Sequence, residues 1–168
     1  MKPIIRKATL NDLEELARLR VLQQHDDWGE DYVDIDNNFY SRTLIAFGNL
    51  IANELGVIFI AEKDNKIIAT CGLQEINVIP QCNDKGKCGF IFNVFTMEEH
   101  RHQGIQTAVM AEVIDYAKQK GIEELALETD NDIAITLYKK FGFKYNDLMM
   151  SKVLREDNWK WKREQYYY

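Results

Sequence analysis

The stretch Arg101-His102-Gln103-Gly104-Ile105-Gln106-Thr107 decides how this chain is interpreted. It lies between an apolar, strand-like run at 90–95 and a strongly amphipathic segment. The first N–H groups of a helix have no intrahelical partner, and the helix dipole adds positive charge beside them. A strand, a basic turn with a glycine and a helix start therefore predict a site for a phosphate-bearing ligand.

The turn differs from two common phosphate-binding loops. No Gly-Lys-Ser/Thr follows Gly104, as a P-loop requires, and the chain has no Gly-x-Gly-x-x-Gly dinucleotide fingerprint. The turn resembles the Arg/Gln-x-x-Gly-x-Gly/Ala loop of the GNAT superfamily, the GCN5-related N-acetyltransferases, which wraps the pyrophosphate of acetyl-CoA. Arg101 and Gly104 match this pattern. Gln106 departs from it, because the family has a small residue there that lets the backbone approach the phosphate, so the Gln106 side chain must turn away.

A second motif strengthens the resemblance. The family's C-terminal motif reads Asn-x-x-Ala-x-x-Leu-Tyr-x-x-x-Gly-Phe, and the chain matches it in register at Asn131, Ala134, Leu137, Tyr138, Gly142 and Phe143. The two motifs occur in the family's order and at its separation. The resemblance is clear over 87–154 and weaker over 4–78, so it covers most of the chain.

The resemblance implies the fold. It is an α/β (α+β layered) GNAT fold, with a mixed, mostly antiparallel sheet of six to seven strands, helices on both faces and a splay between strands 4 and 5. Residue patterns predict strands at 4–7, 57–62, 66–78, 88–96, 125–129, 143–145 and 148–154. They predict helices from a Thr9–Asp12 capping box to about 21, at 40–51 with Gly56 ending the helix, at 103–120 capped by Gly121, and at 133–141.

Composition narrows the class of protein. At 168 residues, with 46% apolar and 29% charged residues, the chain is expected to form one soluble domain, 1–168. A net charge of −6 argues against a general nucleic-acid binder. No apolar run of about 18 residues predicts a membrane span, and no signal-peptide core begins the chain. An odd cysteine count without a framework spacing favours the cytoplasm. His100 and His102 lack a third ligand, so no metal is expected.

Two segments stand apart by composition. Residues 21–41 hold six acids and no Lys or Arg. They form either a solvated loop or a rim that attracts a cationic amine. The rim interpretation makes Asp26, Asp27, Trp28, Asp31 and Tyr32 candidate acceptor-binding residues. The aromatic tail 155–168 is expected to pack on the domain or on a second copy in a homodimer.

The family implies an acetyl-CoA-dependent N-acetyltransferase that acts on a primary amine. A small cationic metabolite is the first expectation for the acceptor, attacked directly in a ternary complex. A peptide N-terminus or lysine is the alternative acceptor. A non-catalytic acetyl-CoA sensor is the alternative from another class; the departure at Gln106 favours it, and the presence of Tyr138 and Glu128 argues against it.

The family also implies roles for particular residues. Tyr138 is expected to protonate the leaving thiolate, or else to be a packed aromatic, and Glu128 to be the base for the amine, or else a surface acid; Glu75 and Asp130 are reserve bases. The Val94–Thr96 backbone should pair with the pantetheine arm, with the Val94 N–H on the thioester oxygen. The remaining expected cofactor contacts are Phe95 and Thr96 on that strand, Arg101, His102, Gln103, Gly104, Ile105, Gln106 and Thr107 around the pyrophosphate, and Asn131 at the pantetheine.

Overall fold

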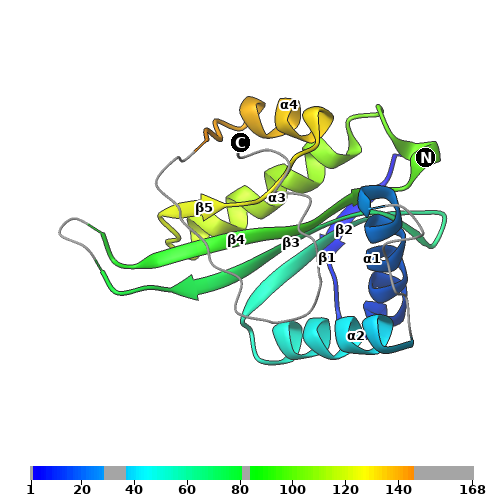
Figure 1. Cartoon of the computed structure of the whole chain (residues 1–168), viewed down its shortest axis with the longest axis horizontal. Helices are drawn as coiled ribbons and strands as arrows, with labels where there is room; N and C mark the ends of the chain where they lie inside the picture. The colour runs from blue at the N-terminus through cyan, green and yellow to red at the C-terminus, as the bar shows by residue number, and fades with distance from the viewer. Residues whose placement is uncertain (1, 29–36, 81–83, 146–168) are drawn as a thin grey trace. The chain divides into compact units, whose positions relative to one another are not determined.

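The computed structural model describes residues 2–28, 37–80 and 84–145 (Figure 1). The chain falls into two compact units, residues 1–130 and 131–168, which are described one at a time. The strand expected at 148–154, the tail 155–168, and the acceptor candidates Asp31 and Tyr32 lie outside the described residues, as does the side chain of Trp28.

The first unit is built on one five-stranded sheet in which neighbours in sequence are neighbours in space. The first four strands pair antiparallel and the fifth joins in parallel, so the sheet is mixed and mostly antiparallel, as expected. The strands are β1 (Ile4–Lys7), β2 (Gly56–Lys63), β3 (Lys66–Asn77), β4 (Lys87–Thr96) and β5 (Glu124–Ala126).

Three helices flank this sheet: α1 (Leu13–Trp28), α2 (Asn37–Ala52) and α3 (Ile105–Gln119). The predicted capping box is confirmed, because the Thr9 N–H donates to the Asp12 carboxylate at 2.7 Å and the Asn11 N–H donates to the Thr9 hydroxyl. It begins a short 3₁₀ turn, Leu10–Asp12, that leads into α1. Helix α1 continues to Trp28, so Asp26 and Asp27 lie on its last turn and not in a loop.

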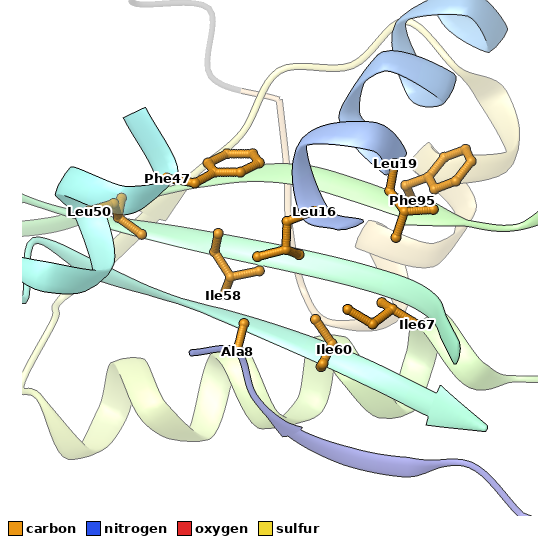
Figure 2. Close-up of a cluster of buried hydrophobic side chains, with 9 residues drawn as sticks. All are labelled: Ala8, Leu16, Leu19, Phe47, Leu50, Ile58, Ile60, Ile67 and Phe95. Carbon is orange, nitrogen blue, oxygen red and sulfur yellow. The ribbon is translucent and has the colours of Figure 1, made fainter. Parts of the chain in front are cut away.

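Helices cover both faces of the sheet: α1 and α2 lie on one side and α3 lies on the other (Figure 1). Alternation along β2 divides the side chains, because Ile58 and Ile60 join the core under α1 and α2 whereas the Phe59 ring packs edge-on against Tyr116 of α3. Figure 2 shows the first core, which consists of Ala8, Leu16, Leu19, Phe47, Leu50, Ile58, Ile60, Ile67 and Phe95. Because Phe95 of β4 is buried in this core together with Leu16 and Leu19 of α1, the last part of β4 is held beneath α1.

Helix α2 ends differently from the prediction, which placed Gly56 at its C-terminus. The Leu55 N–H donates to Leu50 O at 3.0 Å and the Glu54 N–H to Ile51 O, with Glu54 in the left-handed region at φ 51°. This hydrogen-bond pattern closes a helix and usually has glycine at the left-handed position. Gly56 is instead the first residue of β2, where an added Cβ would lie 2.0 Å from the Leu73 carbonyl oxygen.

The second unit is described over residues 131–145 and holds helix α4 (Asp132–Lys140). The strand expected at 143–145 is not formed in it. The Phe143 N–H donates to Tyr138 O at 3.2 Å, closing α4 with Gly142 at φ 86°, and is thereby withdrawn from strand pairing. The described residues therefore form five strands, and the expectation of six to seven is not confirmed.

Candidate functional site

The start of α3 forms a cradle of free backbone N–H groups. Gly104 caps the helix at φ 76° and His102 also has a positive φ, 61°, so the turn curls tightly before the helix begins. Within the described part of the chain, no acceptor is recorded for the N–H groups of residues 102–107. Unpaired N–H groups at a helix N-terminus attract anions, and the predicted phosphate site therefore has the required geometry.

An open strand edge leads towards this cradle. Strands β4 and β5 pair in parallel at three positions, the last joining Phe90 to Ala126. Beyond Phe90, β4 continues to Thr96 with β3 on its other side, and no described strand pairs with its free edge. The pairing of β4 with β5 thus ends at Phe90, and among the described residues the edge of Val94, Phe95 and Thr96 is left unpaired on that side, where an extended ligand arm could add as a strand.

A β-bulge shapes that edge. Thr70 of β3 pairs with Phe95 and Gly72 with Phe92, so Cys71 alone faces both Asn93 and Val94. Asn93 accommodates the extra residue in the left-handed region at φ 52°. Its carbonyl oxygen accepts from the Thr70 hydroxyl at 2.8 Å, while its side-chain Nδ2 donates to that hydroxyl at 3.1 Å.

Asn93 also carries an unsatisfied atom. The residue is 2% exposed, and its Oδ1 has no hydrogen-bond partner among the residues that the structure describes. A buried polar atom without a partner is costly, so the bulge stores free energy next to the open edge. The sequence pointed to this position only indirectly, because Asn is the one polar residue in the run 90–95 and tolerates the left-handed conformation well.

Gln106, the departure from the family pattern, turns its side chain inwards. Its Oε1 accepts from the Thr96 hydroxyl at 2.9 Å, and its Nε2 donates to the Thr70 carbonyl oxygen at 3.2 Å. The amide therefore ties the first turn of α3 to the end of β4 and to Thr70 of β3, which lies opposite the β4 bulge. The backbone N–H of Gln106 keeps its place in the cradle, as the sequence required.

Arg101 makes contacts other than those predicted from the loop motif alone. Its Nε donates to the Thr96 carbonyl oxygen at 3.0 Å, its guanidinium lies 5.8 Å from the Phe95 ring, and its Nη2 pairs with the Asp26 carboxylate. Asp26 is half exposed, and Arg101 offsets its charge. Asp26 and Asp27 are the two acids of the expected rim that the structure describes, and Asp26 is paired with Arg101 of the turn.

Helix α1 brings two further polar side chains to the bulge, which the sequence interpretation missed. Arg20 Nη1 donates to Gln23 Oε1 at 2.8 Å, and Gln23 Nε2 donates to the Val94 carbonyl oxygen at 3.3 Å. Burial lowers the pKa of Arg20, and the charge of Asp27 acts in the opposite direction. The sequence did contain a signal for this contact: Arg20 and Gln23 are polar residues on the same side of the helix as the buried Leu16.

The candidate bases lie in different surroundings. Glu128 is exposed and lies two residues beyond the end of β5, because the strand is shorter than predicted. Glu75 lies opposite Gly89, at the end of the sheet where β4 and β5 are paired, and accepts a hydrogen bond from the Tyr116 hydroxyl at 2.8 Å. Burial and this carboxylate raise the pKa of Tyr116. Glu75 therefore lies at the opposite end of β4 from the unpaired edge of Val94–Thr96.

Two predicted site residues belong to the second unit. Tyr138 is 6% exposed and its ring packs edge-on against Phe143, with centroids 5.9 Å apart. The Asn131 side chain accepts from the N–H groups of Ile133 and Ala134, so it caps α4. A capping role for Asn131 accounts for this position in the motif independently of any ligand.

Comparison with known proteins identifies the family. The Acetyltransferase (GNAT) family model matches residues 13–143. This chain belongs to the GNAT family. A GNAT-fold crystal structure of a predicted acetyltransferase with acetyl-CoA from Clostridium acetobutylicum is 31% identical, with a TM-score of 0.82 over 93% of this chain and 99% of that one. A GCN5-related N-acetyltransferase from Ralstonia eutropha, 20% identical, has a TM-score of 0.72 over 90% of this chain and 98% of that one, and supports the fold alone.

Curated relatives carry N-acetyltransferase names. The probable N-acetyltransferase camello of Xenopus laevis is 30% identical over 68% of this chain and 46% of its own length. An uncharacterized N-acetyltransferase of Methanocaldococcus jannaschii is 27% identical over 86% of this chain and 62% of its own. The chain thus spans less than two thirds of either relative. Among the described helices of this GNAT chain, none is both long and apolar enough to cross a membrane.

Proposed function

We propose that the chain is an acetyl-CoA-dependent N-acetyltransferase that acetylates the primary amine of a small cationic metabolite by direct attack in a ternary complex. The observation that carries this proposal is the continuity of the open β4 edge with the free N–H groups at 102–107. An extended pantetheine arm needs the first feature and a pyrophosphate needs the second. The acetyl-CoA complex of the similar Clostridium protein supports the choice of cofactor.

The reaction has two proton-transfer problems. A lysine-like amine has a pKa of about 10.4, so it is mostly ammonium at neutral pH and must lose a proton before its lone pair can attack the thioester carbon. Glu128 takes that proton, directly or through water; its exposure beyond β5 gives it access to solvent. The Val94 N–H holds the oxyanion that forms when the N–C bond is made.

Collapse of the intermediate breaks the C–S bond. The leaving thiolate takes a proton from the Tyr138 hydroxyl, and the products are an N-acetyl amide and CoA thiol. A phenol suits this step because its pKa of about 10 is close to the value of about 8.5 for a simple thiol. The family resemblance of the Leu-Tyr motif supports this role for Tyr138.

The test is amine-dependent release of CoA thiol from acetyl-CoA. The panel contains polyamines, aminoglycosides, amino acids and short peptides, so it separates the metabolite acceptor from the peptide or lysine alternative. Tyr138→Phe is expected to lower kcat about 100-fold or more with little change in KM for acetyl-CoA. Tyr145→Phe, on an exposed tyrosine of the same unit, is the matched control.

Glu128→Gln tests the base separately. Its kcat should be low at neutral pH and should recover as the pH approaches the pKa of the amine, because the amine then loses its proton to solvent. Equal pH profiles for the wild type and this variant would remove Glu128 from the mechanism. Saturable acetyl-CoA binding without thiol release for any amine would favour the sensor alternative.

A further inference from the structure

One side of α1 faces the bulge of β4. Positions 16, 20, 23 and 27 follow one another at helical spacings of three and four residues, so they share a side of the helix. Leu16 is fully buried in the core above the sheet, and Gln23 reaches the Val94 carbonyl oxygen. Arg20 lies between these two positions and donates to Gln23, so its guanidinium is connected to the bulge through the Gln23 amide.

Arg20 differs from the arginines nearby. Arg6 holds Asp12 and Glu62, Arg18 holds Glu15, and Arg101 holds Asp26, whereas no ion pair recorded among the described residues includes Arg20. Arg20 is also half-buried, and its recorded hydrogen bond goes to a neutral amide.

This environment of Arg20 lowers the stability of the protein when no ligand is bound. A guanidinium has five N–H donors in a planar fork, and one neutral acceptor satisfies only a small part of them. Burying a cation without a carboxylate in contact costs free energy, and the charge of Asp27, which acts on Arg20, offsets only part of that cost. A carboxylate that arrives with a ligand would restore that free energy, because a planar fork and a carboxylate can form two parallel hydrogen bonds.

We propose that Arg20 binds a carboxylate of the acyl acceptor, so that the acceptor is an amino-acid-like molecule carrying both an amine and a carboxylate. The inference rests on the proposed function and narrows its acceptor class. Arg20 is linked through Gln23 to Val94, the residue assigned to the thioester oxygen. A carboxylate on Arg20 therefore anchors the acceptor next to the carbon that its amine attacks.

The same cation selects against other amines. A polyamine brings only positive charge, which the Arg20 guanidinium repels; Asp26 is paired with Arg101, and the charge of Asp27 already acts on Arg20. An amino-acid-like acceptor brings a carboxylate of opposite charge to Arg20, which the burial of Arg20 makes more favourable. Charge complementarity therefore favours the amino-acid-like member of the acceptor panel.

The experiment compares acceptors in pairs that differ by one carboxylate. Lysine is paired with cadaverine, ornithine with putrescine, and a free-acid dipeptide with its C-terminal amide, all by CoA thiol release. The wild type is expected to prefer each carboxylate form at least about 10-fold in kcat/KM. Arg20→Gln should bring this ratio near one by raising KM for the carboxylate form, with KM for acetyl-CoA unchanged.

Two further variants complete the design. Arg18→Gln is the matched control, because Arg18 lies on the same helix but is exposed and paired with Glu15, and it should keep the wild-type ratio. Arg20→Lys keeps the charge and loses the fork, so an intermediate ratio is expected, and it provides a test if Arg20→Gln does not fold.

The outcomes distinguish the inference from the proposed function. Thiol release that is equally fast with decarboxylated amines, or a carboxylate preference that survives Arg20→Gln, would overturn the inference and leave the acetyltransferase in place. No thiol release with any amine would overturn the proposed function and the inference with it.

Discussion

Asn93 and Thr70 are bonded to each other twice across β3 and β4. The Thr70 hydroxyl donates to the Asn93 carbonyl oxygen at 2.8 Å and accepts from the Asn93 side chain at 3.1 Å. Both residues are almost completely buried, at 0% and 2% exposure. One hydroxyl thus satisfies the backbone carbonyl that the bulge withdraws from the ladder and the side-chain amide of the same residue, which holds Asn93 in its left-handed conformation.

Valine has the shape of threonine but lacks its hydroxyl. Thr70→Val therefore leaves the carbonyl and the side-chain amide of Asn93 buried without this partner, and it is expected to destabilise the protein by about 1–3 kcal/mol. Urea unfolding followed by circular dichroism measures this change. Thr136→Val is the control, since the Thr136 hydroxyl bonds to a backbone carbonyl on an exposed helix surface. Equal midpoints for the two variants would show that the paired hydrogen bonds do not stabilise the bulge.

Gln106 and its neighbour Thr107 should separate stability from cofactor affinity. Gln106→Ala loses hydrogen bonds to Thr96 and Thr70, so unfolding should become easier by about 1–2 kcal/mol. Thr107→Ala removes an exposed hydroxyl at the cradle and should weaken acetyl-CoA binding with almost no change in unfolding. Denaturation and calorimetric titration of both variants give the two readouts. A Thr107→Ala protein that unfolds early and binds normally would contradict this division.

Acid sensitivity should arise in part at Asp12. Its hydrogen bond to the Arg6 guanidinium lowers the pKa of Asp12 to about 2, below the value of about 3.9 in an unfolded chain. A depressed carboxyl pKa contributes stability that is complete above about pH 4 and is lost as the pH falls towards 2. The contribution is at most about 2.6 kcal/mol and is reduced by solvent screening, because Arg6 is more than a third exposed.

Asp12→Asn should therefore be less stable than the wild type at pH 7 and should lose less stability between pH 4 and 2. Thermal unfolding over this range makes the comparison. Asp115→Asn, in an exposed pair with Lys118, should reproduce the wild-type acid limb. Parallel acid limbs for the Asp12 variant and the wild type would assign the acid sensitivity to other groups.

The sequence predicted the elements better than their ends. Periodicity located β2, β3, β4 and α3 to within two residues, because each has a strong apolar pattern. It misplaced the end of α2 because Gly56 seemed the natural left-handed residue. Tertiary contact explains the difference: Gly56 is required by the close Leu73 carbonyl, and Glu54 adopts the left-handed turn.

The site was predicted in the same uneven way. The cradle at 102–107 follows from local sequence, since a motif specifies a turn and a helix start, whereas the open edge of β4 was expected only from the family resemblance. Gln23 contacts Val94, which is 71 positions away, and Arg20 is connected to the bulge only through Gln23. The conformation of Asn93 depends on a one-residue bulge, so no local pattern encodes these contacts. Polar residues on otherwise apolar faces were the signal at all three positions.

Arg101 has a consequence for how two ligands would influence each other. Its guanidinium bonds to Thr96 at the mouth of the cradle and to Asp26 on the last turn of α1, the helix that carries Arg20 and Gln23. A displacement of the 101–104 turn by acetyl-CoA would therefore act, through the Arg101 side chain, on the side of α1 that is proposed to bind the acceptor. Such linkage is reciprocal: whatever factor the first ligand applies to the affinity of the second, the second applies to the first.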